Sequence, residues 1–169
     1  MTIEQIANIE TKLYSTVLDL YKKEPTEELT EKLKTVFESY KQVHRLYSDL
    51  AKEQNEALKR RLFIQWYAMT EPSYLTGIGE LDEEAEKNII DLVEYKIQNN
   101  ALDTELKWML NYYANWEFVF DRFKNSKGLA ELTANRIDDL PVGLIIDKIA
   151  MNKRGQMGVY WNSLNHFTN

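Results

Sequence analysis

Apolar residues recur at alternating steps of three and four along most of this chain, the spacing that gathers side chains on one face of an α-helix. The clearest stripe consists of Leu29, Leu33, Val36, Tyr40, Val43, Tyr47 and Leu50. After Leu50 the stripe changes phase and continues at Leu58, Leu62, Trp66 and Met69. Residues 26–70 therefore form either one long helix with a stutter or two helices. We expect two, with a break near Asn55, because a single helix would run about 66 Å, too long for a compact domain of this size.

Capping residues and prolines place the other helices. Thr2 and Gln5 fit a capping box at the start of a helix that ends before Pro25. Asp82 and Asp103 can each accept a hydrogen bond from the first turn of a helix that follows. Shorter helices are expected at 129–136, 141–151 and 159–167. No alternating strand pattern of useful length interrupts them.

The stretch from Asp103 to Phe123 is the most aromatic of these helices. Its apolar residues are Leu106, Trp108, Met109, Leu110, Tyr112, Tyr113, Trp116, Val119, Phe120 and Phe123. A helix that is apolar well beyond one stripe is buried on more than one side. The sequence therefore predicts an all-α chain, a single domain over residues 1–169 in which about six helices form an irregular bundle around the 103–123 helix.

Composition indicates an ordinary folded domain with an acidic surface. Of the 169 residues, 44% are hydrophobic and 28% are charged, and the formal net charge is −6. That charge disfavours nucleic acids and anionic membranes as partners, because both attract positively charged proteins. No stretch is apolar over the length of a membrane span, and the first residues lack the basic and apolar regions of a signal peptide. We therefore expect a cytoplasmic protein.

Few side chains are available for catalysis or metal binding. The chain has no cysteine, which excludes disulfides, thiolate chemistry and cysteine-ligated metals. The histidines do not form the Glu-x-x-His pairs of carboxylate-bridged metal sites, because Lys41 stands three residues before His44 and Ser163 three before His166. Serine-nucleophile, Walker and dinucleotide-binding motifs are missing as well. We expect no cofactor, no metal and no catalytic residue, and a binding protein more readily than an enzyme.

Two polar features have a functional and a structural interpretation. Lys59, Arg60 and Arg61 form the densest basic run, and Glu56 lies one helical turn before Arg60. We interpret this run as a solvated, partly paired surface rather than a phosphate contact. His44 lies beside the apolar stripe and is interpreted as an imidazole at the edge of the core.

The segment FIQWYAMTEPSYLTGIGELD, residues 63–82, combines four aromatic residues with one proline and two glycines. Pro72 ends the helix before it, and the glycines permit turns with positive φ. An exposed corner would not need so many apolar residues, so we expect a packed structural loop in which Tyr74 and Leu75 are buried. If both were exposed and mobile, the loop would become a candidate site for a partner.

Two functions of different classes fit these features. The first is a non-enzymatic helical module that binds another protein or itself, since the chain holds four tryptophans and ten tyrosines, which often anchor interfaces. The alternative is a small-molecule-binding protein or enzyme with an aromatic-lined pocket between helices. The candidate binding residues are Trp66, Tyr67, Glu71, Tyr74, Trp108, Tyr112, Trp116 and Glu117.

A weaker alternative is a DNA contact through a C-terminal helix-turn-helix over residues 141–167. The second helix of that motif, QMGVYWNSLNHF, contains no Lys or Arg with which to hold phosphates. We therefore expect an unknown protein partner or a homo-oligomer rather than a nucleic acid.

Overall fold

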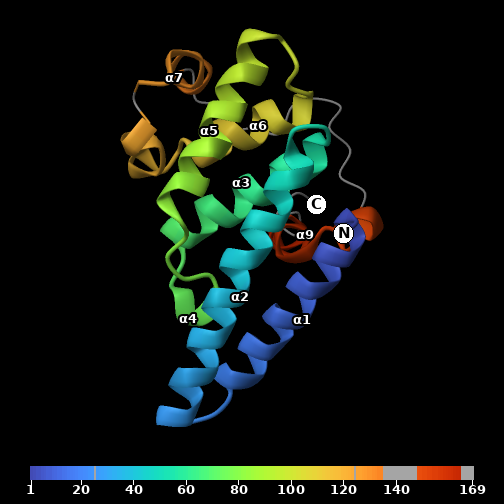
Figure 1. The fold of residues 1–169 in the computed structure, drawn as a ribbon, viewed down its shortest axis with the longest axis vertical. Coiled ribbons are helices and arrows are strands. Elements are labelled where there is room, and N and C mark those ends of the chain that lie inside the picture. The colour runs from blue at the N-terminus through green and yellow to red at the C-terminus, as the bar shows by residue number, and fades with distance from the viewer. Residues whose placement is uncertain (25, 124, 135–147, 165–169) are drawn as a thin grey trace.

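The computed structural model describes residues 1–24, 26–123, 125–134 and 148–164, without the side chains of Glu117 and Lys148. All regular structure in these residues is helical (Figure 1). The elements are α1 (Ile3–Tyr21), α2 (Glu27–Ala51), α3 (Asn55–Thr70), α4 (Ser73–Thr76), α5 (Glu83–Gln98), α6 (Thr104–Tyr113), the 3₁₀ helix η1 (Glu117–Phe123), α7 (Lys127–Ala134), α8 (Lys148–Met151) and α9 (Gly155–Leu164).

The all-α class is confirmed, but the expected number of about six helices is wrong. The described residues contain ten helical segments. Four of these, α4, η1, α7 and α8, are only four to eight residues long. The helix expected at 129–136 corresponds to α7, whereas α4 has no predicted counterpart, because four residues hold too few positions to show a helical period.

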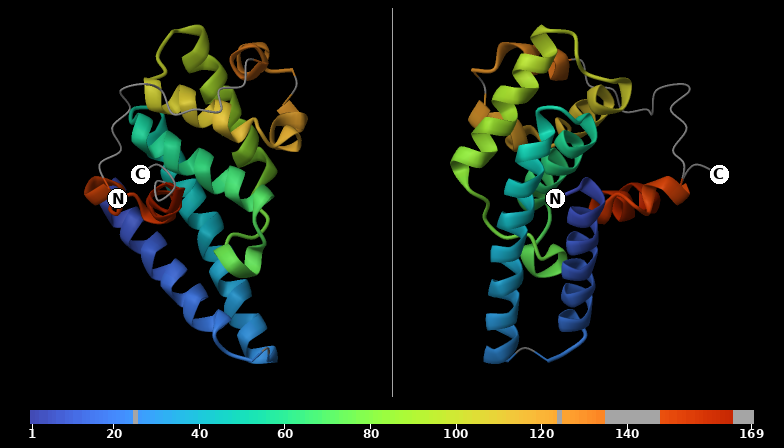
Figure 2. Two further views of the ribbon diagram at one scale, coloured as in Figure 1. Left: turned by 180° about the vertical axis from the view of Figure 1, so that it is seen from behind. Right: turned by 45° about the vertical axis from the view of Figure 1, so that its right-hand side comes forward.

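Helices α1 and α2 form a long antiparallel hairpin that projects from the rest of the molecule (Figures 1 and 2). The predicted capping box begins α1, because Thr2 Oγ1 accepts from the Gln5 amide at 3.3 Å and Gln5 Oε1 accepts from the Thr2 amide at 2.8 Å. Thr26 Oγ1 begins α2 by accepting from the Leu29 amide at 3.2 Å. We call residues 18–24 and 26–33, at the bottom of Figure 1, the hairpin tip.

The predicted break between the second and third helices is confirmed. Helix α2 ends at Ala51, and α3 begins at Asn55 after an extended Gln54. Helix α3 then crosses the molecule and packs against α2, α5, α6 and α9. Every residue from Ala57 to Trp66 is buried. The central helix of the fold is therefore α3, and not the predicted helix over 103–123.

That predicted helix is divided in two. Asp103 begins α6 as predicted, its side chain accepting from the Leu106 amide at 2.8 Å, but α6 ends at Tyr113. The chain bends and continues as η1, with the Val119 amide donating to the Trp116 carbonyl at 3.0 Å. A 3₁₀ helix repeats every three residues, so the apolar steps of three and four continue across the bend. Periodicity alone therefore could not reveal the division.

The chain after α4 inserts between α1 and α2. Gly77 has a φ of +76°, and a Cβ at this position would lie 2.5 Å from Val17 Cγ2 of α1 and 2.9 Å from Val36 Cγ1 of α2. Glycine alone combines this left-handed backbone with so close an approach. The loop is thus held between the two long helices by its backbone.

The same turn exposes the two residues that were expected to be buried. Thr76 and Ile78, on either side of Gly77, face the core, whereas Tyr74 is 53% and Leu75 37% exposed. The prediction that Tyr74 and Leu75 are buried is wrong. The reason is geometric, because the single helical turn of α4 directs residues on one side inward and those on the other outward.

The buried core extends from Ile6 in α1 to Trp161 in α9. Of the helix expected over 141–151, the structure describes only α8, and His166 lies outside the described residues. Across the described ranges, none of the helices combines the length and apolar character that crossing a membrane requires.

Candidate functional site

Five of the predicted site residues meet in one aromatic cluster. They are Trp66 and Tyr67 of α3, Trp108 and Tyr112 of α6, and Trp116 in the bend that follows. The Trp66 ring lies at its centre, with its centroid 5.6 Å from that of Tyr67, 5.9 Å from Tyr112 and 5.1 Å from Trp116. Trp108 joins through Tyr112, at 5.6 Å. The rings pack against one another between α3 and α6.

Four further rings complete this cluster: Phe63, Tyr113, Tyr160 and Trp161. Trp161 belongs to α9, and its ring centroid lies 4.6 Å from that of Trp108. Tyr160 and Trp161 are not among the predicted site residues, because the last helix was interpreted as a possible DNA contact. The spacing of Met157, Trp161 and Leu164, four and then three residues apart, is the signal that indicates an inward face.

The other three predicted residues lie elsewhere. Tyr74 stacks on Tyr21 at the hairpin tip, with ring centroids 6.5 Å apart. Glu71 is exposed at the end of α3, where its charge adds to the larger effect of burial in raising the pKa of Tyr67 to about 12. Glu117 begins η1, and its side chain lies outside the described residues. The predicted set is therefore not one site.

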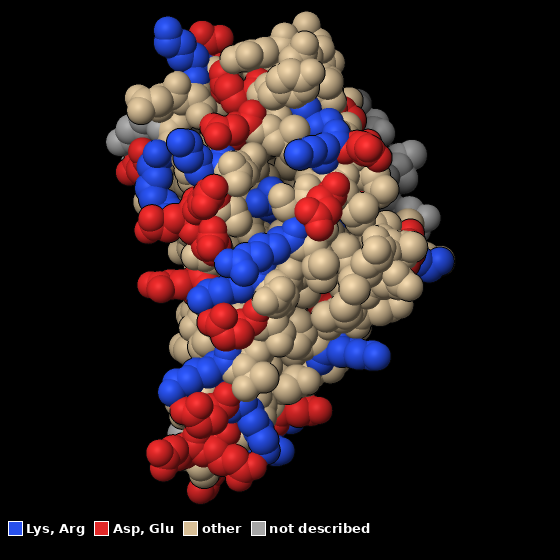
Figure 3. Space-filling view, in the orientation of Figure 1, with Lys and Arg blue, Asp and Glu red and all other residues tan. Residues whose placement is uncertain are grey.

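An apolar groove of about 530 Å³ opens at the hairpin tip. It is lined by Leu20, Tyr21, Lys23, Thr26, Leu29, Thr30, Leu33 and Tyr74, and we call it the tip groove. Tyr21 is 63% exposed, and Leu18, beside it on α1, is also exposed. Figure 3 shows acidic and basic side chains mixed together around this end of the molecule. The groove is thus apolar at its centre and charged at its rim.

The tip groove exists because the apolar stripe of α2 is longer than the part of the hairpin that the other helices cover. Toward the C-terminal end of α2, Val36, Tyr40 and Val43 are buried. Toward the tip, Leu29 and Leu33 continue the same stripe but are only half-buried. Two turns of a core-forming stripe are therefore left without a covering helix from the described part of the chain.

A buried polar cluster surrounds Glu10, farther along the hairpin. The Glu10 carboxylate accepts hydrogen bonds from the Tyr47 hydroxyl at 2.8 Å and from the Gln156 amide at 2.6 Å. The Tyr40 hydroxyl donates to Gln156 Oε1 at 3.0 Å. Gly155 has a φ of +62°, and a Cβ there would collide with the carboxylate. Burial raises the pKa of Glu10 to about 7, and the two donors limit the increase.

The contacts of Glu10 fix the start of α9 in the interior. Gly155, Gln156, Met157 and Gly158 are all buried. A recognition helix reads bases with exposed residues near its N-terminus. The structure therefore gives no support to the C-terminal helix-turn-helix, whose first part, residues 141–147, lies outside the described residues.

The basic run on α3 is buried, so its interpretation as a solvated surface is wrong. Arg60 Nε contacts Glu56 Oε1 at 2.7 Å, the pairing that their spacing predicts. Arg154, just before α9, contacts Glu56 Oε2 and Glu105 Oε1 at 2.5 Å each. Lys59 also reaches Glu105, at 2.5 Å. These cations neutralise carboxylates of α3 and α6 and attach the start of α9 to both helices.

Arg61 and His44 are buried as well, on the side of α3 that meets α2 and α5. Arg61 donates to Ser48 Oγ at 2.9 Å and to the Ala85 carbonyl. Burial, together with the charge of Arg61, lowers the pKa of His44 to about 3. His44 is therefore a neutral imidazole at ordinary pH, and it is fully buried rather than at the edge of the core as expected.

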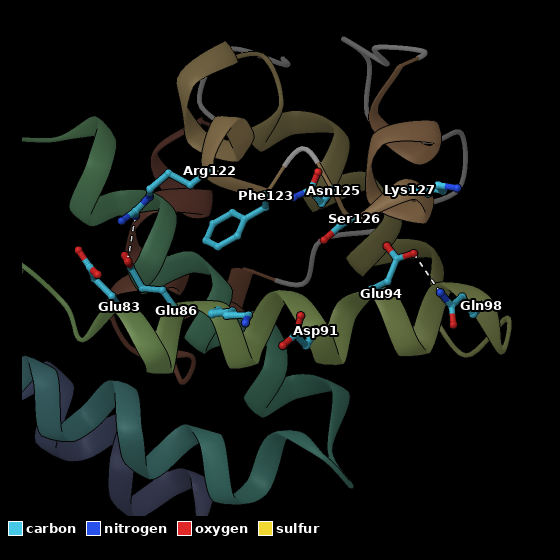
Figure 4. Close-up of a pocket in the computed structure, with 11 residues that line it drawn as sticks. Glu83, Glu86, Asp91, Glu94, Gln98, Arg122, Phe123, Asn125, Ser126 and Lys127 are labelled. Atoms are coloured by element: carbon cyan, nitrogen blue, oxygen red, sulfur yellow. Dashed lines mark hydrogen bonds and ion pairs between the residues drawn. The ribbon is translucent and has the colours of Figure 1, made fainter.

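A second groove, of about 590 Å³, runs along α5 (Figure 4). Arg122 Nη2 crosses to Glu86 Oε2 at 2.9 Å, and Glu94 accepts from the Gly128 and Leu129 amides at 2.9 and 3.0 Å. Burial raises the pKa of Glu86, whereas the backbone bond from Gly128 lowers that of Glu94. Both carboxylates thus hold η1 and α7 against α5, and we assign this groove a structural role.

Within the described residues, no three His, Asp or Glu side chains are grouped as a metal site requires. Glu10, whose pKa burial raises to about 7, and His44, whose pKa burial lowers to about 3, are each 1% exposed. Neither group is open to a substrate in this conformation.

No family model, curated protein or solved structure matches this chain. Geometry alone therefore indicates which surface of the molecule binds a partner or ligand. Among the surfaces described above, the tip groove is the one that combines exposed aromatic rings with an uncovered continuation of the core, as interface surfaces do.

Proposed function

We propose that this chain is an irregular helical bundle that acts as a non-enzymatic interaction module. Its tip groove receives an amphipathic helix, either of another protein or of a second copy of the chain. The observation that supports this is the uncovered stripe of Leu29 and Leu33 beside the exposed rings of Tyr21 and Tyr74. Residence in the cytoplasm stays a prediction from the sequence.

The exposed area of the Tyr21 and Tyr74 rings limits how much binding free energy these two residues can supply, and this indicates what a partner must also contact. A tyrosine buries about 150–250 Å² in an interface, so covering the exposed halves of Tyr21 and Tyr74 removes about 200 Å² from water. At about 25 cal/mol per Å², burying this area contributes about 5 kcal/mol to binding. The loss of translational and rotational freedom on association costs about 4–15 kcal/mol, so the two rings alone do not give stable binding. Stable binding therefore also needs contacts with Leu29 and Leu33, which a helix lying along α2 supplies.

Site-specific photo-crosslinking in cells tests the proposal. We expect a photo-reactive amino acid at Leu29 to give a crosslinked species of discrete mass, because that position lies inside the groove. The matched control is Tyr95, an exposed tyrosine on α5 (62% exposed) away from the tip. Adding Tyr74→Ala should abolish the Leu29 product. Equal products from positions 29 and 95, or none from 29, would refute a function at the groove.

One observation favours a second candidate, the small-molecule pocket. The indole N–H groups of Trp66, Trp108 and Trp161 are buried in the aromatic cluster without an acceptor among the described residues. Buried donors are normally paired, and an acceptor on a ligand between the rings would satisfy them. A thermal-shift screen tests this, since a ligand at about 100 times its dissociation constant stabilises by about 2.7 kcal/mol. Stabilisation should be lost in Trp108→Phe, and a screen without stabilising compounds would count against the pocket.

A further inference from the structure

We infer that the occupant of the tip groove is a second copy of this chain, with the two α2 helices antiparallel across a two-fold axis. This inference rests on the proposed function, because it names the partner that the groove receives. The charges that flank the groove are complementary to those of a second copy in one orientation.

The hairpin tip and the adjoining Lys34 carry both signs of charge in nearly equal number. Residues 19–34 include five carboxylates and four lysines, whereas the whole chain has a net charge of −6. A surface that meets its own copy across a two-fold axis needs both signs, because each charge faces a different residue of the same surface. A groove built for a strongly basic or acidic partner would instead carry one sign at its rim.

Glu27 and Lys34 lie on one flank of the groove. They are seven residues apart on α2, so two helical turns place them on the same line along the helix. That line lies beside Thr30, which lines the groove, about 40–60° farther around the helix. The flank therefore has a negative charge toward the hairpin tip and a positive charge two turns away from it.

The antiparallel orientation is the one that matches these charges. When two helices run antiparallel, flanking positions of the same kind face each other, so Glu27 meets Lys34 of the second copy and Lys34 meets its Glu27. In a parallel pair, Glu27 would face Glu27 and Lys34 would face Lys34. Like charges in contact disfavour that arrangement.

The lysine is free to exchange its present contact for the intermolecular one. Lys34 Nζ contacts Glu31 Oε1 at 2.6 Å, with about two thirds of both side chains exposed. An exposed pair of this kind contributes little to stability. Glu27 makes no ion pair with any residue in the described part of the chain.

A charge-swap experiment tests the register. Glu27→Lys and Lys34→Glu are each made alone, together in one chain, and as an equimolar mixture of the two single variants. Sedimentation velocity from micromolar to millimolar concentration gives the dimer dissociation constant. Lys107→Glu is the control, because it reverses the charge of an exposed lysine on α6, which lies at the opposite end of the molecule from the hairpin tip (Figure 1). Thermal denaturation of each variant confirms folding.

We expect the wild type to dimerise, and each single variant to raise the dissociation constant about tenfold or more, because each creates two like-charge contacts. The double variant and the mixture should recover the wild-type value, and Lys107→Glu should not change it. A wild type that stays monomeric overturns the second copy as occupant. If Tyr74→Ala weakens the dimer but charge reversal does not, the register alone is overturned. A dimer insensitive to both overturns this inference and the proposed use of the groove together.

Discussion

Replacing Glu10 with glutamine should remove a pH dependence that this buried carboxylate imposes on folding. Burial raises its pKa to about 7 from an unperturbed 4.5. Between these two values the folded chain holds a proton that the unfolded chain has released. Stability therefore falls as pH rises from about 4.5 to about 7, and it stays at the lower value above pH 7.

The size of this effect follows from the same two values. Each pKa unit corresponds to about 1.36 kcal/mol, so ionising Glu10 in the interior costs about 3 kcal/mol of folding free energy at pH 8. Glutamine resembles the protonated acid in shape. Its Oε1 can accept from the Gln156 amide and its Nε2 can donate to the Tyr47 hydroxyl, so both partners of the carboxylate keep a hydrogen bond.

Urea denaturation followed by circular dichroism at pH 4.5 and pH 8 measures the effect. The stability of Glu10→Gln relative to wild type should rise by about 3 kcal/mol from the lower to the higher pH. Glu53→Gln, an exposed carboxylate between α2 and α3, is the control and should give no such difference. If Glu10→Gln changes stability equally at both pH values, the carboxylate is not desolvated as we argue.

Three further substitutions test other parts of the structure. Because the pKa of His44 in the folded chain is lowered to about 3, only the unfolded chain gains a proton on this residue between pH 7 and pH 4.5, and the wild type loses stability over that range. His44→Gln should reduce this loss by about 3 kcal/mol in urea denaturation. Arg154→Ala should cost about 2 kcal/mol in thermal denaturation by leaving Glu56 and Glu105 with fewer cations, whereas Lys153→Ala should cost little. Gly77→Ala should cost about 2 kcal/mol or more by the same measurement, through its positive φ and the contact with Val17.

The sequence predicts those parts of the fold that depend on neighbouring residues. The caps at Thr2, Asp82 and Asp103 are present because each involves residues three apart. The break near Asn55 follows from a change of phase in one continuous stripe, again a local signal. Fold class and the starts of the long helices are accordingly well predicted, whereas the end of α6 at Tyr113 and the four-residue helix α4 are not.

The burial of Lys59 and Arg60 could not be predicted in this way. Whether a basic run faces solvent depends on carboxylates and helices that approach from distant parts of the chain. Glu105 is 46 residues from Lys59, and Arg154 approaches Glu56 from 98 residues away. The exposure of Tyr74 has the same origin, because no other segment in the described structure covers the side of α4 on which it lies. Composition and spacing contain neither fact.

The two regions of the α1–α2 hairpin have opposite properties, and this contrast supports the proposed interaction. Around Glu10 the two helices are fixed to each other and to α9 by buried hydrogen bonds, which rigidify a structure when every partner is satisfied. Above the tip, the backbone at Gly77 separates α1 from α2 by a fixed distance. The tip groove is therefore held open by contacts that lie outside it. A preformed groove does not have to order its own helices when a partner binds, so more of the binding free energy of Leu29, Leu33 and the two tyrosines is available for association.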